Sequence, residues 1–65
     1  MDPTACLDLA IGALLDSDWE AAFEHACDLL TWLNRGGFPP TGVEAHDAHD
    51  LARVIMCKAA RKERL

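Results

Sequence analysis

Apolar and polar positions follow a helical period along most of the chain, and the signal is clearest between residues 19 and 34. Apolar side chains recur there every three or four positions: Trp19, Ala22, Phe23, Ala26, Leu29, Leu30 and Leu33. Polar residues follow one another on the opposite side: Glu20, Glu24, Asp28, Thr31 and Arg35. No stretch alternates with the period of two that is typical of a strand. The pattern therefore predicts an all-α fold.

The first helix is expected over residues 3 to 15. Asp2 can accept hydrogen bonds from the first backbone N–H groups, and Pro3 suits the first helical position because its missing N–H has no partner there anyway. Only Thr4, Asp8 and Gly12 interrupt the apolar surface of this helix. A helix that is apolar nearly all round needs packing partners on more than one side.

The second helix is expected over residues 18 to 34. The run Ser17-Asp18-Trp19-Glu20 matches a capping box, in which the serine caps the helix start and the glutamate bonds back to it. Gly36 is expected to end the helix in the left-handed conformation, where a side chain with a Cβ is strained.

The third helix is expected over residues 42 to 63. Phe38-Pro39-Pro40 cannot continue the second helix, and the run from Thr41 to Glu44 matches a second capping box. One face carries the expected core residues: Ala45, Ala48, Leu51, Ala52, Ile55, Met56 and Ala59. Residues 1–65 are thus predicted to form one compact three-helix domain, an antiparallel hairpin with a third helix packed across it.

The stretch ALLDSDWEAAFEHACDLL resembles the turn and second helix of a tetratricopeptide hairpin, in which an aromatic at the turn is followed by alanine three positions later, as in Trp19 and Ala22. The sequence departs from that family where Ala10 and Ala13 replace its glycine and aromatic, and Leu29 replaces a later alanine. Only one copy is present, whereas repeat arrays need several. The resemblance implies a helical hairpin used for protein contact.

The longer run W-x2-A-x3-A-x2-L-x2-W-L-x-R-G-G-F-P-P is also similar to small bacterial proteins of uncharacterised function. This second resemblance implies no mechanism.

Charge is distributed unevenly along the 65 residues, whose net charge is −5. Residues 1 to 52 carry a net charge of −9, and residues 53 to 65 carry +4. The bases of the second segment are Arg53, Lys58, Arg61, Lys62 and Arg64. Acids near the start of the third helix and bases near its end match its dipole. The alternative is a nucleic-acid or transcription-complex regulator that uses this basic helix, although the acidic body repels nucleic acid.

Candidate chemistry is sparse, so no catalytic residue and no enzymatic activity are predicted. His46, His49 and Asp50 are close enough on a helix to share an ion, but a third protein ligand would have to come from His25 or Cys57. We therefore predict no metal and no cofactor. The three cysteines lack zinc-ligand spacing, and no signal peptide or membrane span is recognisable. Free thiols indicate a reducing, cytoplasmic compartment.

Trp32 lies about 120° from the core stripe of the second helix, so two roles are open to it. It is either an exposed or subunit-facing recognition residue or, as the nearby turn favours, is covered by Phe38 and Pro39. A core this small is marginal alone. We predict a protein-interaction module, self-associating through apolar surface, with these contact residues: Leu7, Leu9, Ile11, Leu14, Trp32, Phe38 and Pro39.

Overall fold

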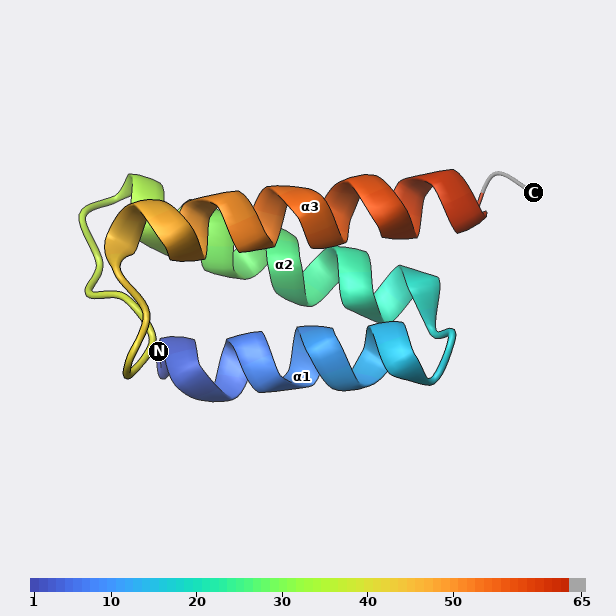
Figure 1. The fold of residues 1–65 in the computed structure, drawn as a ribbon, viewed down its shortest axis with the longest axis horizontal. Helices are drawn as coiled ribbons and strands as arrows, with labels where there is room; N and C mark the ends of the chain where they lie inside the picture. Colours follow the sequence, from blue (N-terminus) through green and yellow to red (C-terminus); the bar gives the residue numbers. More distant parts are fainter. Residues whose placement is uncertain (64–65) are drawn as a thin grey trace.

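The protein folds into three α-helices, as a computed structural model of residues 1–63 shows, with side chains described through residue 62. Helix α1 spans Pro3–Leu15, α2 spans Trp19–Asn34 and α3 spans Ala45–Glu63 (Figure 1). No strand occurs within this part of the chain, so the all-α, three-helix prediction is confirmed. None of these helices combines the length and apolar character needed to cross a bilayer.

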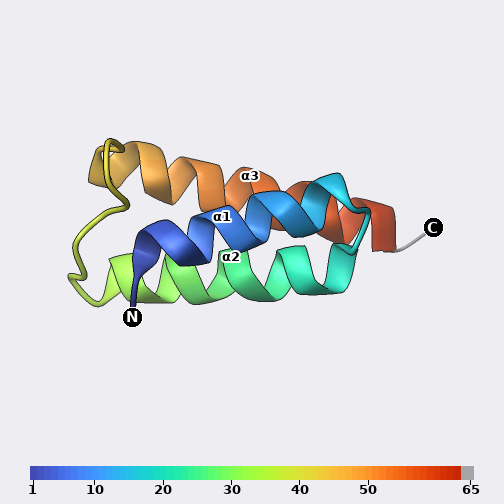
Figure 2. The ribbon, with the colours of Figure 1, turned by 90° about the horizontal axis from the view of Figure 1, so that it is seen from below.

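The central helix of the bundle is α2. Consecutive helices run antiparallel, and α2 packs along both of the others, whereas α1 and α3 touch over a much smaller area (Figures 1 and 2). The molecule is elongated, measuring 34 × 17 × 16 Å. The turn between α1 and α2 lies at one end of the molecule beside the last turns of α3, and the loop from α2 to α3 lies at the other end (Figure 1).

Alanine dominates the core between the helices. Among residues 1–62, ten apolar residues other than proline are buried, and six of them are alanines: Ala10, Ala22, Ala26, Ala48, Ala52 and Ala59. Small side chains allow helix axes to approach closely. The apolar stripe predicted for residues 19 to 33 is confirmed, since every member is buried or packs against the core. On α3, Ala45 and Leu51 were wrongly assigned to the core and are exposed.

The start of α1 is capped as its sequence predicts. The Asp2 carboxylate accepts hydrogen bonds from the backbone N–H groups of Thr4 and Ala5, at 3.0 and 3.3 Å, and Pro3 occupies the first helical turn. These bonds satisfy two donors that would otherwise have no partner within the helix.

The turn between α1 and α2 corrects one predicted boundary. Asp18, not Ser17, caps α2, which begins at Trp19; the Asp18 carboxylate accepts from the N–H of Ala21 at 3.3 Å. Ser17 instead forms part of the C-terminal cap of α1. Its φ is +60°, and the N–H groups of Ser17 and Asp18 donate to the carbonyls of Leu14 and Ala13. This pattern is the Schellman motif, whose left-handed residue is usually glycine.

The end of α2 is a second Schellman motif, with the predicted glycine. Gly36 has a φ of +87°, and its N–H donates to the Leu33 carbonyl at 3.1 Å. The N–H of Gly37 donates to the Trp32 carbonyl at 2.9 Å. The expected left-handed role of Gly36 is thereby confirmed.

The predicted start of α3 at residue 42 is wrong, because a tight turn precedes the helix. The N–H of Val43 donates to the Pro40 carbonyl at 3.1 Å, and Gly42 has a φ of +80°, as the third residue of a type II turn requires. Thr41 does not cap α3. Its N–H donates to the Thr4 hydroxyl oxygen at 2.9 Å, which ties this loop to the start of α1.

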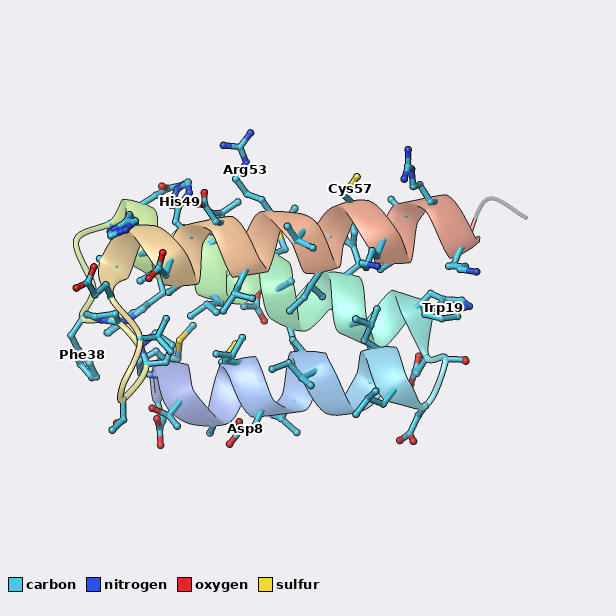
Figure 3. All side chains as sticks on the ribbon, in the orientation of Figure 1. Asp8, Trp19, Phe38, His49, Arg53 and Cys57 are labelled. Atoms are coloured by element: carbon cyan, nitrogen blue, oxygen red, sulfur yellow. The ribbon has the colours of Figure 1, made fainter. Side chains whose placement is uncertain are left out.

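The cysteines are free and differ in burial. Cys6 is buried, Cys27 is half-buried and Cys57 is exposed (Figure 3 shows Cys57 pointing away from the other helices). The Cys6 thiol donates a hydrogen bond to the His25 carbonyl at 3.1 Å. Burial, followed by the charge of Asp28, raises the pKa of Cys6, although a backbone hydrogen bond with Leu29 opposes this shift. Cys6 is therefore a protonated core residue at neutral pH.

Thiol reactivity should follow this order of burial. With Ellman's reagent at neutral pH, we expect Cys57 to react first and Cys6 at least ~100-fold more slowly, because the reactive species is the thiolate and Cys6 must be uncovered before it ionises. Cys57→Ser should remove the fast phase alone. An equally fast phase that survives in Cys57→Ser would contradict the lower accessibility of Cys27 and Cys6.

Candidate binding surfaces

Trp32 is half-buried and is partly covered by the loop that follows its own helix, as the covered alternative expects. Its indole N–H donates to the Phe38 carbonyl at 2.9 Å. The two rings meet edge to face, with centroids 5.4 Å apart and planes at 88°, within the range favoured by aromatic pairs. Gly37 lies against the indole, where a Cβ at this position would overlap Cε2 and Nε1.

The exposed part of this cluster is Phe38 rather than Trp32. The Phe38 side chain is 63% exposed and points away from the helices at one end of the molecule (Figure 3). Trp32 and Pro39 are both half-buried. Of the predicted contact residues at this end, Phe38 therefore offers the most accessible apolar surface.

The apolar residues of α1 divide between the core and solvent. Leu7, predicted as a contact residue, is buried in the protein's own core, so this assignment is wrong. Leu14 is half-buried against the core. Ile11, in contrast, is 39% exposed, Leu9 56% and Leu15 80%.

The exposed side of α1 forms a continuous surface, which we call the α1 outer face: Ala5, Asp8, Leu9, Ile11, Gly12 and Leu15. Ile11 and Leu15 are one helical turn apart, and Asp8 and Leu15 are two turns apart. Figure 3 shows Asp8 pointing away from α2 and α3. A Cβ built at Gly12 would meet no atom within 4 Å. No part of the described chain covers this face at Gly12.

The histidines near the start of α3 do not form the cluster considered from the sequence. His49 Nε2 is hydrogen-bonded to the Asn34 amide oxygen at 2.8 Å, which joins α3 to the end of α2. His46 instead approaches Glu44 at 3.6 Å and Asp47 at 3.3 Å. One possible metal-ligand atom from each of Glu44, His46 and Asp47 lies within 4.8 Å of the other two. All three residues are exposed to water.

A pocket of about 310 Å³ lies where the end of α1, the start of α2 and the last turns of α3 meet. We call it the Trp19 pocket; its lining residues are Leu14, Trp19, Lys58, Arg61 and Lys62. Figure 3 shows the Trp19 side chain between the start of α2 and the last turns of α3. Trp19 packs against the core, as its place in the apolar stripe predicts. The pocket itself has no local signal in the sequence, because its lining residues are up to 48 positions apart in the chain.

The basic residues of α3 are not equivalent. Lys58, Arg61 and Lys62 line the Trp19 pocket, whereas Arg53 does not (Figure 3 shows Arg53 pointing away from the bundle). Arg64 lies outside the described residues. A nucleic-acid surface along residues 53 to 64 stays a prediction.

No protein-family model, no curated protein and no solved structure matches the chain. The resemblance to a tetratricopeptide hairpin therefore stays a prediction, and function has to be argued from the surfaces themselves.

Proposed function

We propose that the protein is a small interaction module that self-associates through the α1 outer face. The observation that supports this most directly is the exposure of Leu9, Ile11 and Leu15 on one side of a helix whose other side is already in the core. Ile11 and Leu15 are neighbours on this side, and Leu9 lies on it beyond Asp8 and Gly12. Exposed apolar side chains that gather on one side of a helix are typical of interaction sites, whereas isolated ones are ordinary.

The energetic argument starts from the small size of the core. Leu29 and Pro3 are the large side chains that are fully buried, and most of the remaining core is alanine. A domain of this length gains only marginal stability from its own burial. Burying a leucine side chain contributes about 1.5–3 kcal/mol. A second copy that covers Leu9 and Leu15 would therefore add stabilisation comparable to a large part of the domain's own.

The shape of the α1 outer face suits a second copy of the same helix. Gly12 and Ala5 have little or no side chain, so the axes of two α1 helices can come close. In a two-fold pair both subunits contribute the same patch to the interface, so Leu15 of each subunit is buried against the other. Asp8 is the one charged residue of this face, so the pair brings two carboxylates together. Added salt should strengthen the association by screening them.

Sedimentation equilibrium over a range of protein concentrations tests the proposal. We expect Leu15→Lys to weaken self-association by at least ~100-fold, because each dimer loses two buried leucines and acquires two buried charges. The matched control is Val54→Lys. Val54 is 50% exposed on α3, outside the α1 outer face, and its replacement should leave the association constant unchanged.

Two results would contradict this proposal. One is a wild-type chain that remains monomeric at a concentration of about 1 mM, where even a weak interface should be occupied. The other is an equal loss of association in Val54→Lys and Leu15→Lys. The salt series separates this function from nucleic-acid binding, since phosphate contacts weaken steeply with added salt.

A further inference from the structure

We propose that the Trp19 pocket binds a small aromatic anion, that is, a flat ring system carrying a phosphate or a carboxylate. This function is separate from self-association, because four of the five lining residues belong to α2 and α3, and the fifth, Leu14, is not part of the α1 outer face. The pocket volume of about 310 Å³ lies at the lower end of the range of small-molecule sites.

The apolar part of the pocket suits a flat ring. Leu14 and Trp19 are both half-buried, so each is held by packing against the core while part of its surface lines the pocket. An indole offers a ring surface on which an aromatic ligand can stack or pack edge to face. Sites for small molecules typically combine such an apolar lining with a few polar groups that fix the orientation of the ligand.

The polar part of the pocket suits an anion. All three charged residues that line it are basic: Lys58, Arg61 and Lys62. Among the side chains that the structure describes, no carboxylate lies within 4.0 Å of their charged groups. The pocket therefore concentrates positive charge on a protein whose net charge is −5. Lysine and arginine can both donate charge-assisted hydrogen bonds to phosphate or carboxylate oxygens.

Stabilisation of the α3 dipole explains only part of this arrangement. Bases in the last turn of a helix are favourable wherever they point around its axis. That effect does not require an indole from α2 and a leucine from α1 beside the same bases. The combination of these groups around one open pocket is what points to a ligand.

Nuclear magnetic resonance offers a direct test, because the two tryptophans lie 13 residues apart on α2, or about 20 Å along its axis. The indole N–H signal of Trp19 reports on the pocket, and that of Trp32, which is bonded to Phe38, serves as the reference. The probes are AMP and 2-naphthoate, which carry a phosphate and a carboxylate. Inorganic phosphate and adenosine are the controls, because the first carries only the anion of AMP and the second only its ring system. We expect AMP or 2-naphthoate to shift the Trp19 signal with a Kd of about 1 mM or below, and to leave Trp32 unmoved.

Variants of α3 supply the matched comparison. Lys58→Gln and Lys62→Gln should each weaken binding of the better probe by at least ~10-fold. Arg53→Gln removes a base from the same helix without touching the pocket and should bind as the wild type does. Because these positions are exposed, the variants are expected to remain folded, which the unchanged Trp32 signal would verify.

Three outcomes would overturn the inference. The first is that neither probe moves the Trp19 signal at about 10 mM, a concentration that would occupy most of a site with a Kd of about 1 mM. The second is that inorganic phosphate or adenosine binds as tightly as AMP, so that ring and anion are not recognised together. The third is that Arg53→Gln weakens binding as much as Lys58→Gln. Because a monomeric Leu15→Lys chain retains the pocket, failure of self-association would not affect this result.

Discussion

Replacing Leu29 with alanine is expected to lower the free energy of unfolding by about 3 kcal/mol and the melting temperature by about 12–24 °C. Leu29 is a fully buried large side chain on α2, the helix that packs against both of the others. Its truncation removes buried apolar atoms and leaves a cavity that neighbouring alanines, with no longer side chain to rearrange, cannot fill. A domain of 65 residues has a total stability of about 3–10 kcal/mol, so this loss is a large fraction of it.

The control for this change is Leu15→Ala, which removes the same atoms from a side chain that is 80% exposed. In dilute solution, where self-association is negligible, it should change stability by no more than about 0.5 kcal/mol. Thermal denaturation followed by circular dichroism measures both. Equal losses in the two variants would show that Leu29 does not hold the position in the core assigned to it.

Replacing Gly37 with alanine is expected to destabilise the protein by about 2 kcal/mol through the Trp32 indole. Gly37 does not have a positive φ, so backbone conformation is not the reason for a glycine here. A methyl group at this position would overlap Cε2 and Nε1 of Trp32. Either the loop or the indole must move, and the hydrogen bond from the indole N–H to the Phe38 carbonyl would be weakened or lost.

The other glycines provide controls for this effect. Gly36→Ala adds a methyl group in open space but at a φ of +87°, so it should cost only about 1 kcal/mol of backbone strain. Gly12→Ala lies within a helix and in open space, and should stabilise the protein by about 0.5–1 kcal/mol. Tryptophan fluorescence and chemical denaturation distinguish the three. An unperturbed Trp32 signal in Gly37→Ala would contradict the close contact.

Sequence reasoning succeeded where a local pattern had a single physical solution. The stripe from Trp19 to Leu33 was correct because only one face of that helix is apolar enough to be buried. The Asp2-Pro3 start and the Gly36 end follow from backbone chemistry that acts within a few residues. The prediction that Thr41 caps α3 was wrong, because Pro40 and Gly42 form a turn that outweighs the match to a capping box.

The candidate sites were less accessible to sequence reasoning, because they depend on how helices cross. On α1, Leu7 and Leu9 are both apolar neighbours of Asp8, and nothing local indicates that the first is buried and the second exposed. The Trp19 pocket requires the end of α3 to reach the turn between α1 and α2. That position is set by the packing of whole helices rather than by any motif.

The alanine content of the core has a consequence for how so short a chain becomes ordered. A methyl side chain has no rotamers to lose on burial, whereas a buried leucine or isoleucine gives up about 0.5–1 kcal/mol of side-chain conformational entropy. Six of the ten buried apolar residues incur none of this loss. The interior of this bundle thus offers less hydrophobic gain than a leucine-lined one, but it also meets less entropic opposition. The ordering of this small core is therefore opposed by a smaller loss of side-chain entropy than a leucine-lined core with the same number of buried residues would meet.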